Sequence, residues 1–278
     1  MTPMNPLLKA QKIGFLGAGN MAQAMLKGLI EGGIPAHHIY ATNRSEGKLI
    51  KLKEQFHINT LTNNEELVET CDIIILAVKP QDLLTALEPI GRAFDDTKVV
   101  VSVAAGIRMQ KLERFLNGAR LSRVMPNTPS LIGRGVIGYL LNDDDDNALE
   151  STVEDLFTPL GRVIKVADED QFEALMISCS SGTGFVFEMM MYWQDWIEEH
   201  GFSAEEARLM TIETFVGASL LAAQAREGVE DLQARVTSKK GVTAAGLQSM
   251  RELEIERALR ISFEKAAMRN KEMAREIK

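Results

Sequence analysis

The first part of the chain alternates short apolar runs with segments of helical periodicity. Residues 12–16 form a brief apolar run that is followed by glycine, and residues 21–31 then repeat apolar side chains at helical spacing. Residues 72–78 and 98–103 are rich in Ile and Val and are apolar at most positions. Continuous apolar runs are typical of strands that helices cover on both faces. This order of strands and helices predicts a parallel, doubly wound α/β sheet.

The pattern changes near residue 167. Before that point a last short strand is expected over residues 162–166, and after it only helical patterns occur. These later helices are expected over residues 171–200, 204–224 and 243–278. We therefore expect two domains, an α/β domain over residues 1–167 and an all-α domain over residues 168–278.

The most apolar stretch of the chain, residues 172–193, contains two glutamates and three serines. Such a stretch is too polar for a membrane span, and it predicts a buried helix of a bundle instead. No membrane partner is therefore expected.

Charge and cysteine content narrow the class of protein further. The formal net charge is −8, and an acidic surface repels the phosphates of nucleic acid, which is therefore not an expected partner. The two cysteines, Cys71 and Cys179, form neither a disulfide framework nor a metal-type spacing. The first residues lack a charged segment followed by an apolar run, so no signal peptide is expected. These features predict a cytoplasmic protein without a metal centre.

A glycine-rich turn follows the first expected strand and reads Gly17-x-Gly19-x-x-Ala22. The first glycine permits the tight turn, and the second lets the backbone approach a pyrophosphate. Ala22 permits close packing of the following helix on the strand. The free N–H groups at the start of that helix then bind phosphate. In this context the pattern predicts a Rossmann dinucleotide-binding domain.

The residues after the second expected strand indicate which dinucleotide is bound. A cofactor with a free ribose diol usually meets Asp or Glu about 20 residues after the glycines. This chain has Asn43, Arg44 and Ser45 there. Arg44 can pair with a 2′-phosphate and Ser45 can donate a hydrogen bond to it. We therefore expect NADP, with NAD as the alternative; the other interpretation of Arg44 is a solvated loop residue.

Seven short segments, in this order, resemble the pyrroline-5-carboxylate reductase family over nearly the whole chain. They are residues 14–22, 41–45, 76–80, 102–106, 125–129, 181–184 and 236–243. The family reduces 1-pyrroline-5-carboxylate to L-proline with NAD(P)H, the last step of proline biosynthesis. Its members have a Rossmann domain followed by a helical domain that builds a dimer. The resemblance implies the same fold and activity, NADPH as cofactor, a small imino acid as substrate, and a homodimer or larger homo-oligomer.

The resemblance also implies which residues form the site. Cofactor contacts would come from Gly17, Gly19, Asn20, Met21, Asn43, Arg44, Ser45, Asn64, Val78, Lys79, Pro80, Ala104, Ala105 and Gly106. The substrate would lie against Ser238, Gly241, Val242 and Thr243, and Thr243 would give the catalytic hydrogen bond to the imine nitrogen. From the residues alone, this segment is either an anion site at the start of a helix or an ordinary helix cap.

Departures from the family pattern lie in the substrate half. Members usually read Thr-Ser-Pro-Gly-Gly where this chain has Thr237-Ser238-Lys239-Lys240-Gly241. Lys240 thus stands where glycine would accept positive φ more easily. A proline usual near residue 185 is Phe185 here. These departures keep two alternatives open: an NADP-dependent reductase of another small imine or oxo acid, and a non-catalytic NADP-binding paralogue.

Overall fold

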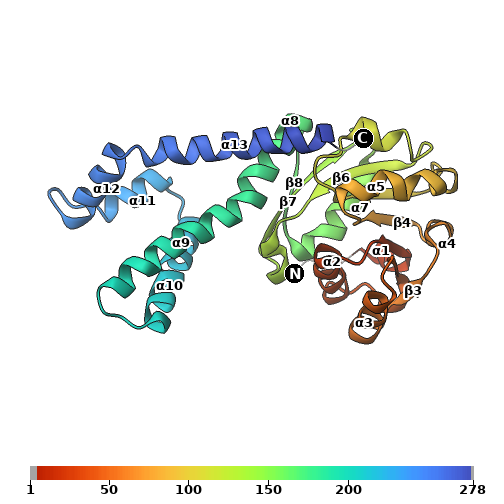
Figure 1. Ribbon diagram of the computed structural model, residues 1–278, viewed down its shortest axis with the longest axis horizontal. Coiled ribbons are helices and arrows are strands. Elements are labelled where there is room, and N and C mark those ends of the chain that lie inside the picture. The colour runs from red at the N-terminus through yellow and green to blue at the C-terminus, as the bar shows by residue number, and fades with distance from the viewer. Residues whose placement is uncertain (1–4, 277–278) are drawn as a thin grey trace. The chain divides into compact units, whose positions relative to one another are not determined.

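The computed structural model describes residues 5–276 and contains one eight-stranded sheet (Figure 1). The spatial order is β3-β2-β1-β4-β5-β6-β7-β8. The strands are β1 (Ile13–Leu16), β2 (Ile39–Thr42), β3 (Asn59–Leu61), β4 (Ile73–Leu76), β5 (Val99–Ser102), β6 (Arg120–Met125), β7 (Gly135–Leu141) and β8 (Gly161–Lys165). In this spatial order, neighbouring strands from β3 to β6 pair in parallel. Strand β7 is antiparallel to β6, and β8 is parallel to β7. The predicted parallel, doubly wound α/β sheet is confirmed.

Helices alternate with these strands along the chain. They are α1 (Pro6–Ala10), α2 (Asn20–Glu31), α3 (Glu46–Phe56), α4 (Asn64–Thr70), α5 (Pro80–Leu87), α6 (Met109–Glu113), α7 (Asn147–Phe157) and α8 (Glu169–Leu175). All four residues of β4 are fully buried, which explains its uninterrupted apolar run. Leu26 and Leu29 of α2 are buried in the same core as Ile13 and Phe15 of β1.

The contacts within the chain divide it into two compact units. One holds the chain up to Ser180 together with the segment from Ala267 onwards, and the other is Ser181–Ala266. The boundary expected at residue 167 marks the change from strands to helices. The units divide later because α8 packs on β7 and buries Phe172, so that this helix stays with the sheet.

The second unit is helical. It contains α9 (Gly182–Glu199), which follows a π-helical stretch at Met176–Ser181, and then α10 (Ala204–Gln224), α11 (Val229–Arg235), α12 (Val242–Glu252) and the first part of α13 (Ile255–Glu276). The single helix expected over residues 243–278 is wrong, because α12 and α13 are separate. Glu254 between them has a φ of +51°, a left-handed conformation that interrupts the helix.

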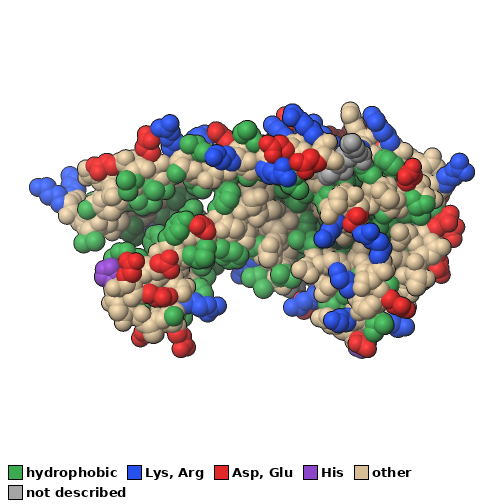
Figure 2. All heavy atoms as spheres, in the orientation of Figure 1, with side chains coloured by type: hydrophobic (Ala, Val, Ile, Leu, Met, Phe, Trp, Pro, Cys, Tyr) green, Lys and Arg blue, Asp and Glu red, His purple; other side chains and the backbone are tan. Residues whose placement is uncertain are grey.

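The expectation of a buried helix over residues 172–193 is also wrong for the chain by itself. In α9 only Gly182 and Ile197 are buried, whereas Trp193 and Trp196 are exposed. Figure 2 shows hydrophobic side chains gathered on the surface of this unit. By length and composition alone, the helical stretch Glu169–Glu199 could cross a membrane, and 17% of its most apolar window is buried.

Candidate active site

The register of the parallel strands brings the predicted cofactor segments to one edge of the sheet. Leu16 at the end of β1 pairs with Thr42 of β2 and with Leu76 of β4, and Leu76 pairs with Ser102 of β5. The residues that follow each strand therefore emerge together. The chain order reverses between β1 and β4, the place where open α/β sheets bind ligands.

The glycine turn after β1 has the geometry that a pyrophosphate site requires. Gly17 has a φ of +110°, and a Cβ atom there would lie 2.7 Å from the backbone of Ala77. Gly19 begins α2 as its N-cap, no side chain of the described residues caps that helix end, and a Cβ on Gly19 would meet no atom within 4 Å. The first N–H groups of α2 thus lack a side-chain cap, and Gly19 leaves space beside them, which fits the phosphates of a dinucleotide.

The segment after β2 is tied to the glycine turn. The side-chain oxygen of Asn43 accepts a hydrogen bond from the N–H of Ala18 at 3.4 Å, and its amide nitrogen donates to the carbonyl of Ser45 at 3.2 Å. Arg44 reaches across to the first turn of α5, where it forms an ion pair with Asp82. The side chain of Arg44 remains 83% exposed. Its cation therefore lies at the edge of the predicted site, free to take a second anionic partner.

The other predicted cofactor residues follow β3, β4 and β5. Asn64 is the first residue of α4, Lys79 is the N-cap of α5, and Pro80 opens that helix. After β5, Ala104 is buried and Gly106 has a φ of +74°. The contacts of these residues, and of Val78 and Ala105, with a cofactor stay predictions.

Asn127 is a polar residue of this edge that sequence analysis did not assign. It follows β6 and is buried; its amide nitrogen donates to the carbonyl of Cys179 at 3.1 Å, and its oxygen accepts from the N–H of Val136 at 2.9 Å. With Asn20 and Met21 it lines a cavity of about 490 Å³. Its position within the resembling segment 125–129 was the only signal in the sequence.

The predicted substrate segment lies in the second unit, in the turn before α12. Lys240 has a φ of +61°, so this lysine adopts the left-handed conformation that glycine would accept more easily. The N–H of Gly241 donates to the carbonyl of Ser238 at 3.0 Å, and a Cβ on Gly241 would lie 2.2 Å from the Ser238 hydroxyl. The lysine-containing loop therefore forms a closed turn.

The start of α12 does not support the interpretation as an ordinary capped helix. Gly241 is the N-cap, and no side chain among residues 5–276 accepts a hydrogen bond at this helix end. Val242 and Thr243 form the first turn and are exposed. The N–H groups of this turn and the hydroxyl of Thr243 are thus available to a ligand with a carboxylate.

Two families of known proteins match this chain, one over each of its two parts. Residues 12–106 match the family described as NADP oxidoreductase, coenzyme F420-dependent, and residues 169–273 match the family described as pyrroline-5-carboxylate reductase dimerisation. The fold and the glycine turn define the class: an oxidoreductase that binds a nicotinamide dinucleotide. Within it, the chain belongs to the pyrroline-5-carboxylate reductase family.

Relatives that match this chain over nearly their whole length support this assignment. The chain is 31% identical to pyrroline-5-carboxylate reductase of Pseudomonas aeruginosa, with 97% of this chain and 99% of the relative covered. It is 32% identical to the enzyme of Vibrio alginolyticus, with 96% and 98% covered. Among solved structures, the Plasmodium falciparum enzyme with NADP bound has a TM-score of 0.86 at 25% identity, with 96% and 99% covered. The Coxiella burnetii enzyme has a TM-score of 0.84 at 32% identity, with 96% and 98% covered.

Proposed function

We propose that the protein reduces 1-pyrroline-5-carboxylate to L-proline with NADPH. The observation that carries the proposal is the match to reductases of that name over nearly the whole chain, which includes both the dinucleotide domain and the helical domain. The relative solved with NADP bound supports the choice of cofactor. Arg44 supports it independently, because a guanidinium pairs well with a 2′-phosphate.

The residues of the first unit bind and orient the cofactor. The N-terminus of α2 receives the pyrophosphate, because its N–H groups lack side-chain partners and Gly19 leaves room beside them. Arg44 takes the 2′-phosphate. When bound, NADPH supplies the hydride for the ring carbon of the imine. The segments at Val78–Pro80 and Ala104–Gly106 would then border the nicotinamide half.

The residues of the second unit hold the substrate. The imine nitrogen is basic and carries its proton readily, so the reaction needs orientation more than proton delivery. The hydroxyl oxygen of Thr243 accepts a hydrogen bond from the protonated nitrogen. Ser238, Gly241 and Val242 present the N-terminus of α12 to the carboxylate. The carbon–nitrogen double bond becomes a single bond, with hydride on carbon and a proton on nitrogen.

One observation favours a second candidate function. Lys239 and Lys240 add two positive charges to the turn that holds the predicted substrate residues. A small imino or oxo acid with an additional negative charge would be attracted there. This second candidate keeps the same cofactor site and differs only in substrate.

We also propose that the protein acts in the cytoplasm as a homodimer or larger homo-oligomer. Large apolar side chains of the helical unit, including Phe187, Trp193 and Trp196, are exposed in the single chain, and an interface with a second copy would bury them. The dimerisation family matches this part of the chain. Sedimentation at micromolar concentration should give at least a dimer, and a stable monomer would contradict the proposal.

The activity is tested by mixing the purified protein with NADPH and 1-pyrroline-5-carboxylate and following both NADPH consumption and proline formation. The proposal expects the two to rise together. NADPH binding without turnover of this imine, but with turnover of a more acidic imino acid, would support the second candidate. Binding without any turnover would indicate a non-catalytic paralogue.

A further inference from the structure

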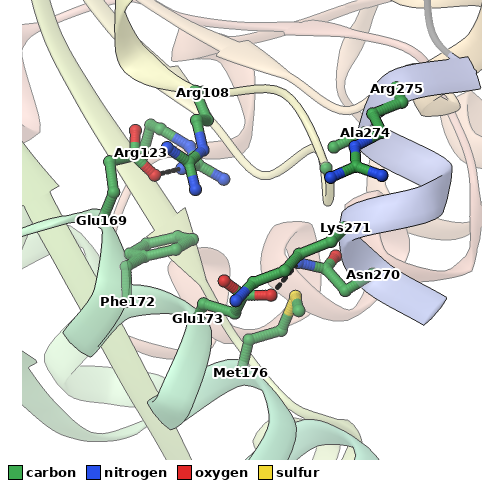
Figure 3. A pocket seen from close by; sticks show the side chains of 11 residues that line it. Arg108, Arg123, Glu169, Phe172, Glu173, Met176, Asn270, Lys271, Ala274 and Arg275 are labelled. Carbon is green, nitrogen blue, oxygen red and sulfur yellow. Dashed lines mark hydrogen bonds and ion pairs between the residues drawn. The ribbon is translucent and has the colours of Figure 1, made fainter. Parts of the chain in front are cut away.

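A second cavity in the first unit has a basic lining that the proposed reaction does not use. Its volume is about 330 Å³ (Figure 3). The walls come from the loop after β5, from β6, from α8 and from the last turns of α13. The charged residues that line it are Arg108, Arg123, Glu169, Glu173, Lys271 and Arg275. Segments far apart in the sequence thus meet around one small space.

Four cations face two carboxylates in this cavity, and both carboxylates already have partners. Glu169 pairs with Arg123 and also accepts the N–H of Met109 at 2.8 Å. Glu173 accepts a hydrogen bond from the side chain of Asn270 at 3.0 Å. Arg108, Lys271 and Arg275 form no ion pair within residues 5–276. The cavity therefore holds an excess of positive charge.

Arg123 is buried in the wall of this cavity and is incompletely satisfied. Its exposed fraction is 3%, and its guanidinium lies 4.2 Å from the centre of the Phe172 ring. Its Nε–H has no acceptor among the described residues. A buried donor without an acceptor costs free energy, more so when it belongs to a charged group. An anion in the cavity would relieve that cost.

Figure 3 shows Arg108 and Arg123 side by side on one wall, while Lys271 and Arg275 reach in from α13 on the other. We propose that this cavity binds a small phosphate-type oxyanion, either inorganic phosphate or the phosphate group of a small metabolite. Guanidinium groups bind such anions through paired N–H donors. A volume of about 330 Å³ lies at the small end of ligand pockets, which suits this class of anion.

The position of the cavity gives the anion a route to the cofactor. Gly106 lines the cavity and ends the segment predicted to border the nicotinamide, and Met109 a few residues later is held by Glu169. An anion that stabilises this loop would strengthen NADPH binding. This consequence rests on the proposed function, whereas anion binding itself does not.

The test is calorimetric titration of the full-length protein with inorganic phosphate, at constant ionic strength maintained with chloride. Saturating NADPH is present throughout, so that the dinucleotide site is occupied and cannot bind the probe. Arg108→Ala and Arg275→Ala are compared with Arg162→Ala, an exposed arginine of β8 that is not part of the cavity lining. We expect saturable binding that each cavity variant weakens by about tenfold or more and that Arg162→Ala leaves unchanged.

A parallel titration with glycerol 3-phosphate separates the two sources of the anion. Tighter binding of the ester assigns the site to a metabolite, and tighter binding of the inorganic ion assigns it to free phosphate. Absence of saturable binding by both probes, or equal binding by wild type and both cavity variants, would overturn the proposal. Because no imine is present, this result does not depend on whether 1-pyrroline-5-carboxylate is the substrate.

Discussion

The guanidinium of Arg44 lies 2.5 Å from the carboxylate of Asp82. The two residues follow different strands of the sheet, so the ion pair fixes a cation beside the glycine turn before any cofactor binds. Because the Arg44 side chain is 83% exposed, the pair contributes little to folding stability. The ion pair instead holds the charge at the place where we predict that a 2′-phosphate binds.

Removal of this cation should reduce the preference for NADPH. We expect Arg44→Ala to raise the KM for NADPH about tenfold or more, because a charge-assisted contact with the 2′-phosphate is lost. The KM for NADH should change little. Steady-state kinetics with both cofactors measure the effect, with Arg162→Ala as the control. An equal rise for both cofactors would mean that Arg44 does not recognise the 2′-phosphate.

The two glycines of the turn should respond differently to alanine. Gly17→Ala should destabilise the protein, because its φ is +110° and the new Cβ would lie 2.7 Å from the Ala77 backbone. Gly19→Ala should fold normally, since nothing lies within 4 Å, but its methyl group would occupy the space beside the helix N-terminus. Thermal unfolding and NADPH titration separate the two effects. If Gly19→Ala bound NADPH as tightly as wild type, the pyrophosphate would lie elsewhere.

Replacement of Lys240 by glycine should stabilise the helical unit. A non-glycine residue in the left-handed region costs about 1–2 kcal/mol, and Lys240 has a φ of +61°. Part of the gain is offset by the greater entropy of glycine in the unfolded chain, so we expect a net increase of about 0.5–1 kcal/mol in the free energy of unfolding. Urea unfolding measures it. The matched variant Lys239→Gly, at a position without positive φ, should not increase the free energy of unfolding. Equal effects of both variants would contradict the proposed backbone strain at Lys240.

The ion pair between Arg120 and Asp146 makes stability depend on pH. Asp146 accepts two hydrogen bonds from Arg120, at 2.6 and 2.7 Å, and one from the N–H of Leu149 at the start of α7. The Arg120 guanidinium lowers the pKa of the Asp146 carboxyl below its usual range. A lowered folded-state pKa gives stability that is present above the ordinary value of about 3.9 and is lost as pH falls through the lowered one.

We therefore expect Asp146→Asn to reduce the free energy of unfolding by about 1 kcal/mol at neutral pH. The difference from wild type should shrink as the pH falls below about 4. Urea unfolding at a series of pH values measures it, with the exposed Asp96→Asn as control. A difference that stays constant down to acidic pH would show that the charge of Asp146 is not responsible.

Several elements of the first unit could be predicted from their own pattern, although the apolar strand β7 was not predicted. The helix expected over residues 21–31 is α2, and the apolar run at residues 72–78 contains β4. By contrast, β6 was not predicted, because Arg120 and Arg123 interrupt its apolar pattern. Their partners, Asp146 and Glu169, lie far along the chain, so the sequence does not show that these arginines can be buried.

The candidate site shows the same limit. Gly17, Asn43 and Arg44 were predicted because dinucleotide-binding domains bind the pyrophosphate directly after the first strand and recognise the ribose directly after the second. The strand register brings these residues to one edge of the sheet. The break between α12 and α13 at Glu254 was not predicted, because the sequence has no glycine or proline at that position. The cavity around Arg123 was not predicted, since its walls are contributed by segments that only folding brings together.

The most direct test of the proposed site is kcat/KM for 1-pyrroline-5-carboxylate, measured with NADPH for wild type, Thr243→Ser, Thr243→Ala and Thr243→Val. Thr243 is exposed, so all variants should fold. If its hydroxyl binds the imine nitrogen, the serine variant should retain most of the activity, and the alanine and valine variants should lose about tenfold or more. Wild-type turnover by the alanine and valine variants would contradict the assignment of Thr243 and of the α12 turn as the substrate site.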